Sequence, residues 1–396
     1  MTHHSCDLVI IGGGCAGLSL ANQLAQQSST LSVHILETRS HYTNDKTWCF
    51  WSNVENEWTA LAKQRWNQWS FQYGDQNTPV IHHGGDWYYY CLDAKSVYQT
   101  IQQNLLHAYR IKLQMNQAVT TVVHANPSDN FQQTTKAATV TTVSGDTYAA
   151  KLVIDTRPPR QMHSTLYQSF FGIECKTSVA CKDIAALMHN LKADEFGTRF
   201  NYILPISPNR ILFEHTRFSP VAIDKASMEA ACQHEIERVG LTHSAIFRKE
   251  YGCLPMGLER SNNPFAAGIA GGALRNASGY GFLRIQQWAQ KIAGQLEQPQ
   301  ASMTIADVLS TRADEHPWLT WMDKLFLKTI KANPVQSAYY FHQLAKHLNS
   351  KQFLRLMTDQ PTNTDLIAIM NALPKMPFLK QLLAPSKNRQ PHDALV

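Results

Sequence analysis

The N-terminal part of the chain alternates between short apolar runs and a segment with helical spacing. Asp7–Ile11 is an apolar, β-branched run, which predicts a strand. From Leu18 to Ala25 apolar side chains recur at the helical period, which predicts a helix. Leu31–Leu36 is a second apolar run and predicts another strand. This order describes a βαβ unit, the building block of a parallel sheet covered by helices.

Three glycines separate the first predicted strand from the helix. Gly12, Gly14 and Gly17 have the spacing Gly-x-Gly-x-x-Gly, and Glu37 follows the second strand. In a dinucleotide fingerprint, the first glycine allows a tight turn, the second exposes backbone to a pyrophosphate, and the third lets the helix press on the strand. Glu37 would bind a ribose hydroxyl and repel the extra phosphate of NADP. The alternative is an ordinary Gly-rich turn, and the fingerprint does not distinguish FAD from NAD.

Two later segments resemble further motifs of flavin-binding enzymes. In KLVIDTRPP an apolar strand ends at Asp155, as in the second nucleotide-side motif of hydroxylase-type flavoproteins. A strand that ends at a proline turn gives the same pattern. Residues 267–287 are again Gly-rich and run into a predicted helix, like the third flavin motif, in which a helix start faces the isoalloxazine ring. The candidate cofactor contacts in this segment are Gly271, Gly272, Gly279 and Tyr280.

The middle of the chain has strand patterns and carries an acid within one of them. Arg210–Thr216, sequence RILFEHT, alternates with a period of two, so Glu214 and His215 are expected on opposite faces. The strand is otherwise apolar, and desolvation would raise the pKa of the Glu214 carboxyl. The alternatives are an exposed position on an edge strand or a salt bridge with a neighbouring arginine.

Aromatic residues are dense in two regions. Trp48 lies in the tract Asn44–Ser52, NDKTWCFWS, and is a candidate to line a cofactor or substrate cavity, although aromatic residues at this density also form ordinary core. From Thr304 to Leu383 the pattern is helical and punctuated by prolines. These helices carry large apolar groups from Trp318 onward.

Composition and charge limit the possible partners and compartments. The 396 residues carry a net charge of +6 without a basic block, which fits weak attraction to an anionic membrane or simple solubility. Basic and aromatic residues do not interleave, so nucleic acid is not expected as a partner. The eight cysteines include no Cys-x-x-Cys pair, so no metal is expected, and we interpret them as reduced thiols. With no signal-peptide pattern and no long apolar run, we expect a cytoplasmic protein.

Five stretches, taken in order, resemble the flavoprotein lycopene cyclases of bacteria and plants, the lycopene β-cyclase group, from about residue 7 to 383. The stretches are the glycine fingerprint, NDKTWCFW, QSFFGIE, YILPISPNRILFEHT, and SGYGFLRIQQWA together with MNALPKMPFLK. The family usually has two adjacent acids where this chain has Glu214 and His215, so the first acid is kept and the second is replaced.

The resemblance implies an α/β fold with three parts. They are an FAD-binding Rossmann-like domain of the glutathione reductase and hydroxylase type, an inserted mixed β-sheet domain for the substrate, and a C-terminal helical region. We expect the FAD-binding domain to be discontinuous. The expected limits are 1–75, 90–160 and 250–300 for the FAD-binding domain, 161–249 for the substrate-binding sheet, 301–385 for the helical region and 386–396 for a disordered tail.

The resemblance also implies the reaction. A lycopene cyclase closes terminal β-rings on lycopene or a related acyclic carotenoid by proton-initiated carbocation cyclisation, with no net redox change. The cofactor would be reduced FAD, with NAD(P)H as external reductant. Glu214 would be the acid, with His215 as a second catalytic candidate. The expected cofactor contacts are Gly12, Gly14, Gly17, Glu37, Trp48, Asp155, Gly271, Gly272, Gly279 and Tyr280.

A polyene substrate would have to be drawn from a bilayer, so we expect peripheral contact with the inner face of the membrane through the C-terminal helices. Two other functions stay open on the same scaffold. One is a flavin-dependent monooxygenase or epoxidase, or a divergent cyclase, acting on another apolar polyene or aromatic substrate. The other is flavin binding without catalysis. Only a cyclase would require Glu214.

Overall fold

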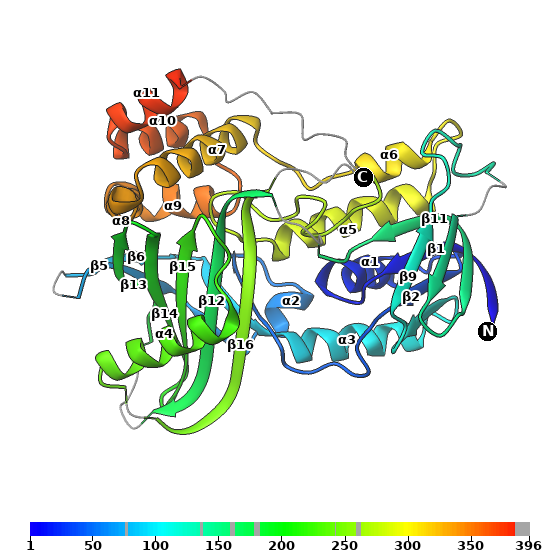
Figure 1. Cartoon of the computed structure of the whole chain (residues 1–396), viewed down its shortest axis with the longest axis horizontal. Helices are drawn as coiled ribbons and strands as arrows, with labels where there is room; N and C mark the ends of the chain where they lie inside the picture. The colour runs from blue at the N-terminus through cyan, green and yellow to red at the C-terminus, as the bar shows by residue number, and fades with distance from the viewer. Residues whose placement is uncertain are drawn as a thin grey trace, which may run out of the picture.

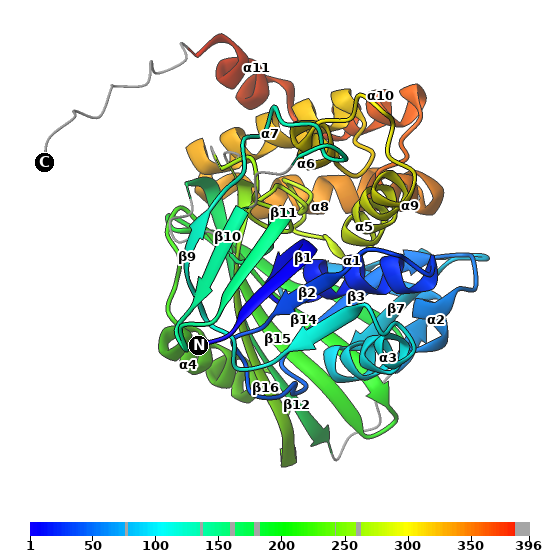
Figure 2. The same cartoon turned by 90° about the vertical axis from the view of Figure 1, so that its right-hand side faces the viewer.

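The protein consists of two large β-sheets and a group of C-terminal helices (Figure 1). The computed structural model describes residues 1–75, 78–134, 138–158, 163–177, 183–241, 243–258 and 263–384. The predicted tail 386–396 lies outside these described residues. Figure 2 shows the C-terminal helices gathered above both sheets.

The first sheet contains the N-terminal βαβ unit. It has six strands in the order β8-β2-β1-β11-β10-β9, and β8, β2, β1 and β11 run parallel. Residues Leu8–Ile10 of β1 are fully buried, because helices cover the parallel strands and leave no solvent-facing side. Helix α1 (Cys15–Gln26) packs against α3 (Ala94–Leu106) and α5 (Phe282–Glu297). The strands are β1 (His3–Ile11), β2 (Val33–Leu36), β8 (Ile111–Gln114), β9 (Val119–Val123), β10 (Ala138–Thr142) and β11 (Thr147–Asp155).

The second sheet has seven strands in the order β16-β12-β15-β14-β13-β5-β6. It is antiparallel except for the pair of β13 and β5. A three-stranded sheet, β3-β7-β4, accompanies the two large ones. The strands of the second sheet are β5 (Gln68–Tyr73), β6 (Val80–His83), β12 (Ser164–Thr177), β13 (Ala185–Asp194), β14 (Gly197–Ser207), β15 (Arg210–Ser219) and β16 (His243–Leu258). Those of the small sheet are β3 (Thr47–Ser52), β4 (Gln64–Trp66) and β7 (Tyr88–Asp93).

The two faces of the seven-stranded sheet are covered by different helices. Alternate residues of β12 and β15, such as Phe171 and Phe213, pack against α4 (Lys225–Arg238). The intervening residues face the other way, where Leu212 packs in a cluster that includes Leu319 and Phe353 of the C-terminal helices. This period of two decides which side chains of β15 reach the site described below.

The C-terminal region is helical, as predicted, and the helix starts are capped. Thr362 and Asn349, for example, form capping boxes at the starts of α10 and α9. The helices are α6 (Ile305–Ser310), α7 (Pro317–Ala332), α8 (Ser337–His347), α9 (Ser350–Met357), α10 (Asn363–Ala372) and α11 (Lys375–Leu383).

Strand pairing crosses the domain limits expected from the sequence. β5 falls in the segment 1–75, yet it pairs with β13 of the seven-stranded sheet. β16 likewise continues past the expected limit at residue 249 and stays paired with β12 to Leu258. Both pairings join segments far apart in the chain, and local apolar patterns carry no information about such partners. The division into domains otherwise stays a prediction.

Candidate active site

The glycine loop between β1 and α1 has the geometry predicted for its first and third glycines. Gly12 has a φ of +97°, the left-handed region that favours glycine. A Cβ at Gly17 would lie 2.0 Å from the carbonyl oxygen of Gly12, so only glycine lets the helix approach the strand this closely. A Cβ at Gly14 would meet no atom within 4 Å. Gly14 therefore presents bare backbone to open space.

That open space belongs to a cavity of about 570 Å³. It extends from the glycine loop, past the aromatic tract, to the cavity-facing side of β12, β15 and β16. Segments far apart in sequence thus share one site. The predicted site residues that line it are Gly14, Trp48, Glu214, Gly279 and Tyr280.

Glu214 faces this cavity from β15. Its Oε1 accepts a hydrogen bond of 2.9 Å from the Thr216 hydroxyl. Burial, together with the nearby carboxylate of Glu250, raises the pKa of Glu214 to about 8, against the opposing effects of Thr216 and Arg248. The carboxyl group is therefore largely protonated at neutral pH and can act as an acid.

His215 does not join Glu214 in the cavity, so the structure does not bring the two predicted catalytic residues together. It lies on the opposite face of β15, where its Nδ1 is 2.7 Å from Asn201 Oδ1. Asn201 in turn donates to Glu235 of α4. Burial lowers the pKa of His215 to about 4, so the ring is neutral near pH 7. The alternation of a strand separates neighbours in sequence, and His215 has a structural position.

Two predicted cofactor residues, Glu37 and Asp155, are not among the residues that line the cavity. The Glu37 carboxylate accepts hydrogen bonds from the Gly13 backbone at 2.7 Å and from Arg39 at 3.0 Å. Asp155 forms an ion pair of 2.6 Å with Arg157. The neighbouring Thr156 lines the cavity instead. The ribose contact expected of Glu37 stays a prediction.

Gly271 and Gly272 are likewise not among the residues that line the cavity, and their predicted cofactor contact stays a prediction. They belong to a tight turn in which the Gly271 N–H donates to the carbonyls of Ala267 and Gly268. The turn directs them toward Arg284 and away from the large cavity. Gly268 lines the cavity in their place. Glycine content alone does not reveal which side of a turn faces a ligand.

Several cavity residues were not singled out from the sequence. Glu250 and Thr47 meet there, with Thr47 Oγ1 3.0 Å and 3.1 Å from the two carboxylate oxygens. Tyr202 also lines the cavity, and the hydroxyl of Tyr280 is 2.9 Å from that of Tyr89. The sequence around an acid in a long, partly polar strand such as β16 does not indicate which residues of other strands the acid contacts. Within the described residues, no group of three or more His, Cys, Asp or Glu side chains is arranged to hold a metal ion.

The two-sheet architecture and the glycine loop after β1 define the class of this protein, a Rossmann-like fold that it shares with solved flavoprotein structures. A geranylgeranyl bacteriochlorophyll reductase-like protein from Thermoplasma acidophilum matches with a TM-score of 0.62 at 12% identity, covering 96% of this chain and 99% of its own. An HpxO variant from Klebsiella pneumoniae, solved in complex with FAD, has a TM-score of 0.63 at 12% identity, covering 92% and 99%.

Within this class, the sequence identifies the family. The family model described as lycopene cyclase protein matches residues 7–383, so this chain belongs to the lycopene cyclase family. A lycopene β-cyclase from Pantoea ananas is 23% identical over 414 aligned positions, which cover 96% of this chain and 97% of that protein. One from a Paracoccus species is 27% identical over 263 positions, covering 60% and 68%. The resemblance seen in five motifs is confirmed.

Proposed function

We propose that this protein is an FAD-dependent cyclase that closes terminal β-rings on lycopene or a related acyclic carotenoid, without net redox change. The observation that carries the proposal is the position of Glu214. A carboxyl group that keeps its proton at neutral pH lies in the same cavity as the open backbone of Gly14. Membership of the lycopene cyclase family supports the choice of substrate.

The residues around the glycine loop fit FAD. Gly14 is the N-cap of α1, and no side chain caps this helix start. The first N–H groups and the positive end of the helix dipole can therefore receive a phosphate. Gly279 and Tyr280 would border the flavin at the other end of the cavity. When bound, reduced FAD would supply negative charge near the reacting end of the polyene, with NAD(P)H as the external reductant.

The reaction needs an acid, an apolar enclosure and a way to stabilise positive charge. Glu214 gives its proton to the terminal double bond of the polyene, at the less substituted carbon, so that a tertiary cation forms. An internal double bond attacks this cation and closes the ring, and a ring carbon then loses a proton. Aromatic faces such as those of Trp48 and Tyr280 would stabilise the cation by about 0.5–2 kcal/mol each. Excluding water prevents capture of the cation as an alcohol.

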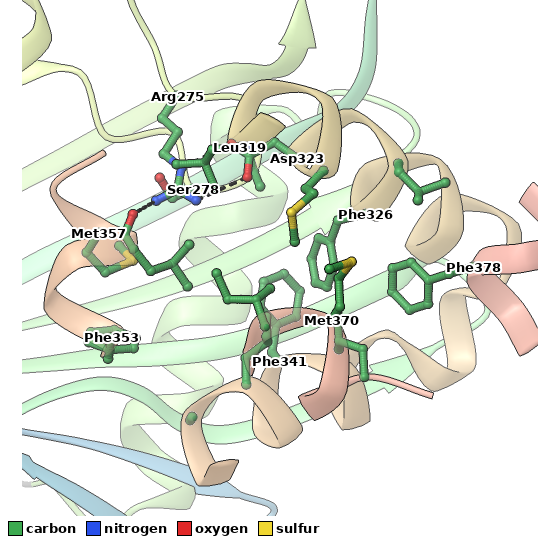
Figure 3. A pocket seen from close by; sticks show the side chains of 18 of the residues that line it. Arg275, Ser278, Leu319, Asp323, Phe326, Phe341, Phe353, Met357, Met370 and Phe378 are labelled. Atoms are coloured by element: carbon green, nitrogen blue, oxygen red, sulfur yellow. Dashed lines mark hydrogen bonds and ion pairs between the residues drawn. The ribbon is translucent and has the colours of Figure 1, made fainter. Parts of the chain in front are cut away.

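A second, apolar pocket of about 360 Å³ supports a long hydrocarbon substrate (Figure 3). It lies between the seven-stranded sheet and the C-terminal helices, with Phe326, Phe341 and Phe378 around it. Tyr202, Ser278 and Tyr280 line both this pocket and the larger cavity. A polyene would place one end beside Glu214 and the rest of its chain between the helices.

The outer side of this pocket supports peripheral contact with the inner face of the membrane. Trp321, Met370, Leu379 and Leu382 line the pocket and are also 43–47% exposed. Lys375, which also lines the pocket, would face anionic lipid headgroups. None of the helices in the described part of the chain combines the length and the apolar character that a membrane span requires.

Expression in a lycopene-accumulating host tests the proposal. Cells should turn from red to orange, and pigment analysis should show β-rings. The purified protein should act without oxygen once its flavin is chemically reduced, and Glu214→Gln should abolish the activity. Oxygen and NAD(P)H consumption that is independent of Glu214 would instead identify a monooxygenase. If the protein shows no turnover of any kind and Glu214→Gln behaves like the parent, the protein would be a flavin-binding protein without catalytic activity.

A further inference from the structure

A glycine lies between two glutamates that project into the cavity. Gly172 of β12 is paired with Glu214 of β15 on one side and with Glu250 of β16 on the other. Directly paired residues on adjacent strands point to the same face. Both glutamates line the cavity, so this face is the cavity side.

The absence of a side chain at position 172 makes the approach possible. The strands flanking β12 are roughly 10 Å apart, a gap that two glutamate side chains can bridge only over an empty position. A Cβ at Gly172 would lie 3.0 Å from Cγ and 3.2 Å from Oε1 of Glu250. Glu250 therefore leans over Gly172, toward the strand that carries Glu214.

The surroundings of the two carboxyl groups differ in charge. Glu250, which is 5% exposed, accepts a hydrogen bond of 2.7 Å from the Arg248 guanidinium and others from the Thr47 hydroxyl. Glu214 accepts its hydrogen bond from Thr216, a neutral donor. A neighbouring cation stabilises the charged form of a carboxyl group. Burial raises the pKa of Glu250 as well, but Arg248 and Thr47 oppose that effect, so Glu250 is the site for the negative charge of the pair and Glu214 the site for its proton.

We propose that Glu250 is the second carboxyl group of this active site and, as the ionised partner across Gly172, keeps the catalytic proton on Glu214. The inference rests on the proposed cyclase function for its role in turnover. Glu250 acts through Glu214 and is therefore a positioning residue. His215 occupies the sequence position of the family's second acid and faces away from the cavity, whereas Glu250 lines the cavity together with Glu214.

The proton balance of the proposed reaction explains how a pair of carboxyl groups would help catalysis. Once Glu214 has protonated the polyene, the pair carries two negative charges, which lie in the cavity where the carbocation forms. Ring closure then releases one proton, and its return to the pair restores a single negative charge. Electrostatic stabilisation of this kind acts only while the cation exists, as catalysis requires.

Four titratable groups around the pair, those of Tyr202, Tyr280, Cys232 and Arg248, keep their charge state near neutral pH. Burial raises the pKa of Tyr202 and Tyr280 above the usual tyrosine value and raises that of Cys232, on the α4 side, to about 12. Arg248 stays positive because Glu250 and Glu174 stabilise its charge. Other charged or titratable neighbours include Lys46, Cys49 of β3 and Glu174 of β12, and the lining of the cavity adds Arg39, Asp45, Tyr89, Tyr98, Tyr251 and Cys253.

Infrared titration of carboxyl groups in the purified, full-length flavoprotein tests the pair directly. The parent protein should show a carboxyl that titrates near pH 8, and this step should vanish in Glu214→Gln. In Glu250→Gln the step should move down by at least about 1 pH unit, because the like charge is gone. Glu250→Asp, whose charge is retained but one methylene further away, should give a smaller downward shift. Glu237→Gln, an exposed acid of α4, is the matched control and should change nothing.

The pH at which cyclase activity falls on the alkaline side should shift with the infrared titration. The downward shift should be larger in Glu250→Gln than in Glu250→Asp. A Glu214 step that stays in place in both Glu250 variants would overturn the proposal and leave Glu250 a structural residue. If Glu250→Gln does not fold, the shift in Glu250→Asp alone decides. A protein that shows the paired titration but forms no rings would refute the cyclase function while leaving the carboxyl pair intact.

Discussion

At the residue scale, the protonation of Glu214 should set the pH dependence of ring formation. Its pKa is raised to about 8, so the proton-donating form is present below that pH and is lost above it. We expect turnover per bound flavin to be level near neutral pH and to fall tenfold per pH unit well above pH 8. A pH–rate profile with dispersed lycopene measures this. Turnover that increases through the same range would contradict a general-acid role.

Removing the Glu214 proton donor should cost far more activity than removing a surface acid. We expect Glu214→Gln to lower ring formation by at least about 100-fold, the usual contribution of a general acid. Flavin absorbance and thermal unfolding should be nearly unchanged, because the amide can still accept the hydrogen bond from Thr216. Glu237→Gln is the control, with parental activity expected. Comparable losses of activity in both variants would mean that the loss comes from the change in net charge and not from the missing proton donor.

The buried pair of Arg275 and Asp323, seen at one end of the apolar pocket in Figure 3, should contribute to stability. Both residues are at most 5% exposed, and Arg275 Nε lies 3.0 Å from Asp323 Oδ2. Asp323→Asn leaves the guanidinium with Asp359, 3.5 Å away, as its nearest anion. We expect a loss of about 3 kcal/mol in the free energy of unfolding, measured by urea titration.

Asp314→Asn is the matched control for that measurement, because Asp314 is 79% exposed in its ion pair with Lys291. The expected change is below about 1 kcal/mol, since solvent screens exposed pairs. Equal losses in the two variants would mean that burial of the Arg275 pair is not what stabilises it.

The sequence predicts the orientation of some individual side chains but not which distant residues they meet. The apolar alternation of Arg210–Thr216 predicted that Glu214 and His215 lie on opposite faces, and the structure agrees. The resemblance nevertheless proposed His215 as catalytic, which its place beside Asn201 does not support. Glu250 was not predicted at all. Its role depends on which strands flank Gly172, and sequence spacing does not encode strand order.

At the scale of elements, the contact between α1 and β1 should depend on the lack of a side chain at Gly17. Gly17→Ala would place a methyl group 2.0 Å from a backbone oxygen of Gly12, which cannot rotate away. We expect a loss of about 1–3 kcal/mol in unfolding free energy, together with weaker FAD retention. Thermal unfolding and the bound flavin per chain measure the two effects.

Gly294 provides the control for Gly17, because it is also a helical glycine. A Cβ there meets nothing within 4 Å. Gly294→Ala in α5 should therefore stabilise the protein by about 0.5–1 kcal/mol through reduced backbone freedom. If Gly17→Ala behaves like Gly294→Ala, the close approach of helix and strand is not required.

Elements were predictable where local pattern determines them. The βαβ unit and the C-terminal helices follow from apolar periodicity, and the fingerprint glycines follow from the turn that they allow. The side toward which Gly271 and Gly272 point was not predictable from the sequence, because it depends on the hydrogen bonds of the turn to Ala267 and Gly268. The pairing of β5 with β13 likewise depends on contacts between distant segments.

At the scale of the whole molecule, the two cavities are formed by different parts of the fold. The larger cavity combines the glycine loop of one sheet with the carboxyl groups of the other, while the apolar pocket lies under the C-terminal helices. Tyr202, Ser278 and Tyr280 stand where the two meet. A rigid hydrocarbon reaching both would enter through the helical side, which places the exposed apolar residues of α10 and α11 at the entrance.

Membrane binding should therefore depend on those residues and not on exposed apolar residues elsewhere. Leu379 and Leu382 of α11 are 46% and 47% exposed, and both line the apolar pocket. The double variant Leu379→Glu and Leu382→Glu should lower co-flotation with vesicles of anionic lipid at least about tenfold, because it removes two exposed apolar side chains that could enter the lipid and adds negative charge that anionic lipid repels. Val143→Glu, which changes a 72% exposed residue in the turn that follows β10, should bind as the parent does. Ring formation from lycopene in vesicles should fall with binding in the α11 variant, whereas lycopene presented in detergent should still be turned over. Unchanged flotation of the α11 variant would exclude this face as the membrane contact.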